Sequence, residues 1–182
     1  MTEGAETPAD DPTSGRKGWS FGRIAAISAF MVIAGMWAWL LSPFADPSHP
    51  DELDDEVFTE AADQRCDEFV DAIDRLPKAN TVESPAQRAV LVDSGTSLTI
   101  ELVEDLETLA PSPASAEGEI VAKWLDDWQI YIGDRDAYAV ALTGGETGPF
   151  RVSARDGEQI TEFIDGFAEV NGMIHCLAPL DV

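Results

Sequence analysis

Residues Glu117–Leu142, EGEIVAKWLDDWQIYIGDRDAYAVAL, carry the strongest structural pattern in the sequence. Large side chains, most of them aromatic, recur there at steps of three and four, the spacing of one face of an α-helix. The members of this face are Val121, Trp124, Trp128, Tyr131, Arg135, Tyr138 and Leu142. Because rings gathered on one helix face are typical of a packed core, we expect this helix at the centre of an all-α domain.

A second helix is predicted upstream, over about residues 55–76, and Pro77 marks its end. Its apolar face consists of Phe58, Ala62, Cys66, Phe69, Ile73 and Leu76.

A third helix is expected between these two, from Ser84 as N-cap and Pro85 as first helical residue to about Ala110. Its expected apolar face is Ala86, Ala89, Val90, Leu98, Leu102, Leu106 and Leu109. The polar run Asp93–Ser97 around Gly95 interrupts that face. It either kinks the helix or lets another helix approach closely.

The last predicted helix covers about Glu158–Val170, and Asn171 with Gly172 can cap its C-terminal end. Residues Phe150–Ala154 alternate weakly, but an isolated strand has no partner in this pattern, so we expect an ordered loop there. Four amphipathic helices with short connections predict a four-helix-bundle-like domain.

An apolar run precedes this domain. From Ile24 to Leu41 no residue is charged, and eighteen residues at about 1.5 Å rise per residue span about 27 Å, close to a bilayer core. Trp19 and Phe21 lie before the run, and Trp37 and Trp39 near its end, where membrane interfaces favour aromatic rings. We therefore expect a transmembrane helix. A cleaved signal peptide is the alternative, but the run exceeds the usual length of about 7 to 15 residues.

Charges beside this run predict its orientation. Arg16, Lys17 and Arg23 precede it and acids follow from Asp46 onward, so the positive-inside rule places the N-terminus in the cytoplasm of a single-pass plasma-membrane protein. The expected organisation is a disordered cytoplasmic tail (1–18), a transmembrane helix (19–44), a proline-rich tether (45–55) and an extracytoplasmic helical bundle (56–182). Alanines at small-xxx-small spacing would let two such helices pack as a homodimer.

The formal net charge is -24, from 35 acidic and 11 basic side chains. Four acidic and three basic residues lie before residue 46, so residues 46–182 carry 31 acidic and 8 basic ones, or -23. Such a domain is repelled by phosphates, which excludes nucleic acid as a partner. The excess of acid keeps the domain soluble, reflects a salty habitat, or forms an interaction face for a basic partner.

Two cysteines occur, Cys66 and Cys176, both beyond the apolar run. A single pair outside the cytoplasm predicts a disulfide, since the pair lacks C-x-x-C spacing and is too small a set for a zinc site. His49 and His175 lack the local carboxylate or second histidine that a metal site or a general base would suggest. Without these, and without nucleophile-elbow or phosphate-loop motifs, we expect no catalytic residue, metal or cofactor, and a protein that is not an enzyme.

The aromatic stripe of the helix predicted over residues 117–142 has two interpretations. The stripe consists of Trp124, Trp128, Tyr131, Arg135 and Tyr138. Its rings, with Asp127, Asp134 and Asp136 nearby, could form a cage for a cationic ligand. The alternative places the rings in the core and pairs Arg135 with an acid on a neighbouring helix.

Residues Trp124–Tyr138 (WLDDWQIYIGDRDAY) and Ile164–Val182 (IDGFAEVNGMIHCLAPLDV), together with Cys66, resemble a set of actinobacterial single-pass membrane proteins of unknown function. The resemblance covers about residues 66–182. It implies an extracytoplasmic domain and supplies no activity.

These observations predict a membrane-anchored extracytoplasmic protein that acts by noncatalytic interaction at the cell envelope. Its expected partners are the lipid bilayer and an envelope protein. The alternative function is an extracytoplasmic sensor or binding domain for a small cationic ligand.

Overall fold

The computed structural model describes residues 21–40, 49–78 and 81–181. The chain divides into two units, Met1–Pro47 and Ser48–Val182. The predicted cytoplasmic tail lies outside the described residues, as does the predicted tether up to residue 48.

The first unit contains helix α1, Phe21–Leu40. Its side chains are described without a gap from Ile24 to Trp39, and all of them are exposed. Within the described ranges, no helix combines the length and the apolar character that a membrane crossing needs. The transmembrane segment therefore stays a prediction.

The second unit confirms the all-α prediction. It consists of α2 (Glu56–Asp74), α3 (Pro85–Leu109), α4 (Ala116–Thr143) and α5 (Ile160–Val170), with one small hairpin before α5. The N-caps follow local chemistry, since Asp55 accepts hydrogen bonds from Val57 N and Phe58 N, and Ser115 accepts one from Gly118 N. Ser84 occupies the N-cap position of α3 as predicted, although its side chain makes no capping hydrogen bond.

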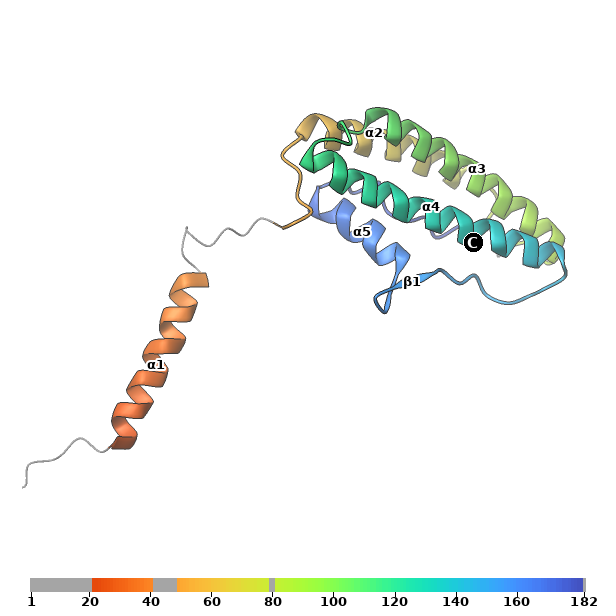
Figure 1. The fold of residues 1–182 in the computed structure, drawn as a ribbon. Coiled ribbons are helices and arrows are strands. Elements are labelled where there is room, and N and C mark those ends of the chain that lie inside the picture. Colours follow the sequence, from red (N-terminus) through yellow and green to blue (C-terminus); the bar gives the residue numbers. More distant parts are fainter. Residues whose placement is uncertain (1–20, 41–48, 79–80, 182) are drawn as a thin grey trace, which may run out of the picture. The chain divides into compact units, whose positions relative to one another are not determined.

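The main helix contacts join neighbours along the chain: α2 packs on α3, α3 on α4, and α4 on α5 (Figure 1). The predicted face of α2 is buried from Phe58 to Ile73, where the face reaches the common core. The core also takes Trp124 and Trp128 of α4 and Ile164 and Phe167 of α5, so α4 is central as the sequence predicts. Burial of such large apolar side chains is the dominant favourable term in folding.

The face of α3 differs from the prediction. Val90 is 61% exposed and Leu109 is 41% exposed, so neither belongs to the core. The buried face instead includes Val92, Gly95, Thr96, Thr99, Leu102, Val103 and Leu106. The sequence pattern did not reveal this face because Thr96 and Thr99 are polar. Both can be buried because their hydroxyl groups donate hydrogen bonds to carbonyl oxygens one turn earlier in the same helix.

Residues 150–153 form an irregular segment as predicted, and a short hairpin lies between them and α5. Strand β1 (Ala154–Arg155) pairs antiparallel with β2 (Glu158–Gln159). The two residues of the turn, Asp156 and Gly157, both have positive φ, the conformation that tight two-residue hairpins require. The expectation of an unpaired segment was therefore wrong at Ala154, because its partner lies only a turn away.

Residues Gly172–Asp181, here called the C-terminal segment, come after the end of α5. The segment begins with Gly172, which has a positive φ of 68°. The segment is tied to α2 by the disulfide of Cys176 and to α4 by the ion pair between Asp181 and Arg135. It therefore closes the domain without being part of a helix.

Gly95 supplies the space for that ion pair. An added Cβ at Gly95 would lie 2.5 Å from Arg135 Nη2 and 2.5 Å from Asp181 Oδ2. α3 is one helix from Pro85 to Leu109, and the groups that come close to Gly95 are the side chains of Arg135 and Asp181.

We expect Gly95→Ala to lower the free energy of unfolding by about 1–3 kcal/mol, despite the better helix propensity of alanine, because the methyl group displaces the buried pair. Gly133→Ala is the matched control. Gly133 lies on α4 with open space around it, and its replacement should raise stability by up to about 1 kcal/mol. Urea denaturation followed by circular dichroism measures both, and equal stabilisation by the two variants would contradict the role of Gly95.

Candidate functional site

The aromatic stripe of α4 is mostly inside the protein. Trp124, Trp128, Tyr131 and Arg135 are buried, and Tyr138 is half-buried. The Trp124 indole donates to Ile164 O and its ring stacks at 4.9 Å on that of Phe167. This arrangement matches the core interpretation, in which the rings pack against neighbouring helices.

Arg135 is the centre of a buried polar network. Its Nη1 and Nη2 donate to the two carboxylate oxygens of Asp181, both at 2.7 Å, and its Nε donates to Thr96 Oγ1 at 3.1 Å. Nη1 also donates to the Tyr131 hydroxyl, which in turn donates to Pro179 O. The expected partner was an acid on a neighbouring helix, but the acid found lies in the C-terminal segment.

Burial and the charges of this network shift the pKa values of Arg135 and Tyr131. Burial acts to lower the pKa of Arg135, but the hydrogen bond to Asp181 and the surrounding groups outweigh it and raise that pKa. Burial raises the pKa of Tyr131, although the nearby Arg135 charge acts the other way. Arg135 is therefore charged and Tyr131 neutral, which leaves a fixed bidentate pair in the core.

The acids that flank the stripe have structural partners. Asp127 is buried and forms an ion pair with Arg155 of β1. Asp134 accepts from the backbone N and the hydroxyl of Ser153, at 2.6 and 2.7 Å. Two of the three carboxylates proposed for a cation cage therefore position the connection between α4 and α5.

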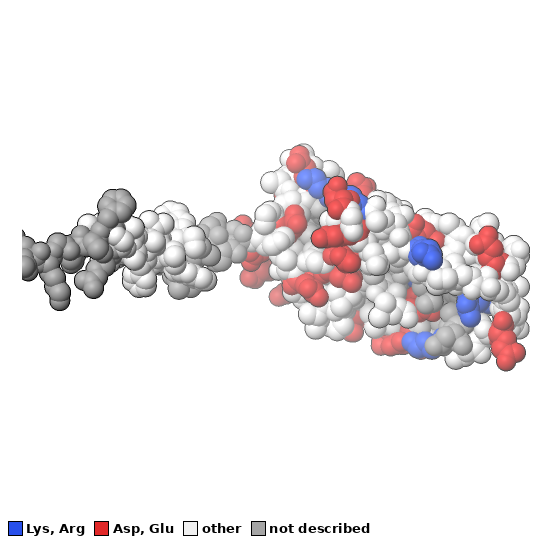
Figure 2. Space-filling view, turned by 90° about the horizontal axis from the view of Figure 1, so that it is seen from below, with Lys and Arg blue, Asp and Glu red and all other residues white. Residues whose placement is uncertain are grey.

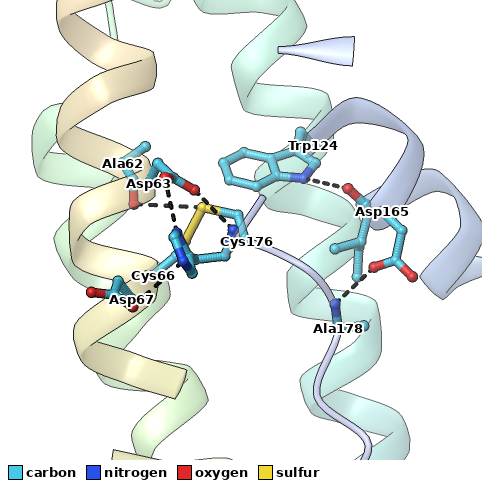
Figure 3. Close-up of a disulfide and its surroundings, with 10 residues drawn as sticks. Ala62, Asp63, Cys66, Asp67, Trp124, Asp165, Cys176 and Ala178 are labelled. Atoms are coloured by element: carbon cyan, nitrogen blue, oxygen red, sulfur yellow. Dashed lines mark hydrogen bonds and ion pairs between the residues drawn. A yellow bond between two sulfur atoms is a disulfide. The ribbon is translucent and has the colours of Figure 1, made fainter. Parts of the chain in front are cut away.

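The predicted disulfide between Cys66 and Cys176 is present and buried (Figure 3). It joins α2 to the C-terminal segment across 110 residues of sequence, with a Cα–Cα distance of 5.0 Å. In the described ranges no cysteine is free, and no group of three or more His, Cys, Asp or Glu side chains is arranged to hold a metal ion.

His175 has carboxylate neighbours that the sequence analysis missed. Its Nδ1 lies 3.0 Å from Asp63 Oδ2, its backbone N donates to Asp63 Oδ1 at 2.8 Å, and its Nε2 lies 3.6 Å from Asp67 Oδ1. The sequence contained an indirect indication of these carboxylate neighbours. A disulfide from Cys176 to Cys66 brings the residue before Cys176 to the turn of α2 on which Asp63 and Asp67 flank Cys66.

A cleft of about 720 Å³ opens beside the outer end of the aromatic stripe. It is bounded by Tyr131 and Tyr138 of α4, the connection 149–152, α5 and the C-terminal segment, with Arg88 from α3. Its volume falls in the range of small-molecule sites, about 300–1,000 Å³. The sequence did not reveal this cleft because its walls come from segments far apart in the chain.

No family model, no curated protein and no solved structure matches this chain. The resemblance to actinobacterial membrane proteins therefore stays untested.

His175 predicts a pH-dependent contribution to stability. The hydrogen bond to Asp63 raises the pKa of His175 above its ordinary value of 6.5, and the charges of Asp63 and Asp67 add to it. The stabilisation is therefore fully present below pH 6.5 and is lost as pH rises through the higher folded-state pKa.

We expect the difference in unfolding free energy between wild type and His175→Gln to be largest near about pH 5.5 and to shrink toward about pH 9. Denaturant titrations at several pH values measure it. His49→Gln, the same substitution at the other histidine, should leave the pH dependence in place. A loss that is the same at every pH would show that the ion pair with Asp63 contributes nothing.

Proposed function

We propose that the chain is a single-pass plasma-membrane protein whose disulfide-stapled helical bundle lies outside the cell and acts there by noncatalytic interaction. The observation that carries this proposal is the buried disulfide between Cys66 and Cys176. Disulfides form and persist in oxidising compartments and are rare in the cytosol. A covalent link that encloses most of the domain supports an extracytoplasmic location.

The anchor is supported by the uncharged run Ile24–Leu41 and by the helical conformation of α1. Apolar side chains are exposed all around that helix, for example Phe30, Val32 and Trp39 at 69%, 72% and 66%. A helix that is apolar all round is typical of an apolar environment such as a bilayer. The basic residues before the run favour a cytoplasmic N-terminus.

The interaction is supported by the charge of the domain surface. On the face shown in Figure 2, acidic side chains outnumber basic ones. Among the described residues, several exposed acids of the adjacent helices α2 and α3 make no ion pair: Glu60, Glu101, Glu104 and Glu107. Unpaired carboxylates exposed on these two helices favour a partner with basic groups, because complementary charge speeds encounter and fixes orientation.

Membrane topology tests the location. We expect the chain to sediment with membranes, and protease added to intact cells to remove the domain while an N-terminal epitope tag stays protected. Non-reducing peptide mapping of the same material should recover a peptide pair linked through Cys66 and Cys176. A chain released in the aqueous fraction, a protected domain, or two free thiols would overturn the proposal. A cytoplasmic protein serves as the protection control.

Site-specific crosslinking in cells tests the interaction. A photoreactive residue is placed at Glu60, Glu101 or Glu104 in three separate variants. Each variant should capture the same partner, which is an envelope protein or a second copy of this chain. The same residue at the buried Leu102 is the control and should capture nothing. Absence of any adduct from all three exposed positions would count against an interaction through this surface.

A further inference from the structure

The basic side chains of the domain are distributed unevenly with respect to ion pairs. Residues 46–182 contain 8 Lys and Arg against 31 Asp and Glu. Five of the eight form ion pairs with carboxylates: Arg65, Arg75, Lys78, Arg135 and Arg155. Among the described residues, Arg88, Lys123 and Arg151 form none. Two of these three, Arg88 and Arg151, line the cleft.

Of the two arginines in the cleft, Arg88 gives the stronger indication of a ligand. Its Nε is buried and has no hydrogen-bond partner among the residues that the structure describes. A buried donor without a partner is destabilising, and because Arg88 lines the cleft, an acceptor bound there would give its guanidinium a partner. Gln159 and Thr161 also line the cleft and add hydrogen-bonding groups to it.

The cleft also has an apolar part to its lining. Phe150 packs on Tyr131 and Tyr138 with ring centroids 6.0 and 5.3 Å apart, and the hydroxyl of Tyr138 is held by Gly148 O. Pro179 and Leu180 of the C-terminal segment add further apolar surface, and Leu180 is fully exposed. Rings beside a small number of polar groups are the usual composition of a small-molecule site.

Among the described residues, one acid lines the cleft, Asp165, and it is already engaged. Its Oδ1 accepts a hydrogen bond from Ala178 N at 2.7 Å. Burial raises the pKa of Asp165, while its hydrogen bond from Ala178 N acts to lower it. With two arginines and one engaged acid, the cleft carries net positive charge within a strongly negative domain. That background disfavours a multiply charged anion and leaves a single negative charge as the best match.

We propose that this cleft binds a small amphipathic monoanion, a carboxylate on an aromatic or alkyl body. The anionic group is held by Arg88 and Arg151, and the apolar body packs on Tyr131, Tyr138 and Phe150. The inference rests on the proposed noncatalytic binding role and names a ligand class for the domain. Its charge is opposite to that of the cationic ligand considered from the sequence. Arginine suits this task because its planar guanidinium donates two parallel hydrogen bonds to a carboxylate.

Three probes with the same body test the charge: 4-phenylbutyrate, 4-phenylbutan-1-ol and 4-phenylbutylamine. The full chain is titrated with each in a neutral detergent, with detergent-only blanks, and ligand-observed NMR gives the dissociation constants. We expect 4-phenylbutyrate to bind at least about tenfold more tightly than the alcohol, and the amine to bind more weakly than either.

Variants test the residues. Arg88→Gln and Arg151→Gln should each weaken binding of 4-phenylbutyrate by about tenfold or more and leave binding of the alcohol unchanged. Arg75→Gln makes the same change in charge on α2, outside the cleft, and should bind as wild type does. Arg151 is exposed and makes no ion pair among the described residues, so Arg151→Gln keeps the test valid if Arg88→Gln fails to fold.

Equal binding of the butyrate and the alcohol, tightest binding of the amine, or butyrate binding unaffected by Arg151→Gln would each overturn the inference. So would a failure of all three probes to bind. These outcomes are independent of the topology experiment, because a domain on the wrong side of the membrane could still bind the probe, and a correctly exposed domain could still ignore it.

Discussion

The bidentate pair between Arg135 and Asp181 is the constraint on which the rest of the domain depends. A guanidinium that is fully buried has to be matched by a carboxylate, because an unpaired charge in the interior is strongly destabilising. That requirement explains why Gly95 leaves room on α3, why Thr96 turns a hydroxyl inward, and why the chain continues past α5 to return to α4. The pair also lies between two apolar regions, the main core and a smaller cluster of Ala89, Val92, Ala139 and Leu142. Arg135 therefore links α4 to Thr96 of α3 and to Asp181 of the C-terminal segment.

Local patterns were sufficient to predict the four helices of the domain, because each signal lies within one element: the periodic faces of α2 and α4, Pro85 at the start of α3, and Gly172 after α5. The disulfide was also accessible, since only two cysteines occur. The buried face of α3 was mistaken because Thr96 and Thr99 are polar by composition but satisfied by their own helix. Asp181 and the partners of His175 could not be read from their surroundings in the chain, because each depends on a contact more than 40 residues away. The cleft was beyond sequence reasoning for the same reason.

The many acidic side chains of the domain fall into groups with different structural roles, which the net charge does not reveal. Several aspartates act as fixed acceptors: Asp55 at a helix N-cap, Asp63 for the backbone of His175, Asp134 for Ser153, and Asp165 for Ala178. These groups organise loops and termini, where backbone N–H groups otherwise lack partners. Four exposed glutamates of α2 and α3 form a separate group that makes no ion pair with any described base: Glu60, Glu101, Glu104 and Glu107. A domain so rich in carboxylates uses most of its few bases to balance them, which is why two arginines in one cleft stand out.

The link between Cys66 and Cys176 also determines what happens when the backbone is cut. The bond encloses α3, α4 and α5 together with the connections between them, so a single cleavage at any of these connections leaves two fragments that remain one molecule. Loops exposed to solvent are the usual points of proteolytic attack. The fragments of a nicked domain keep their high effective concentration and their common core, and they separate only after reduction. The covalent topology thus keeps a nicked domain together as one molecule, beyond any contribution of the disulfide to folding stability.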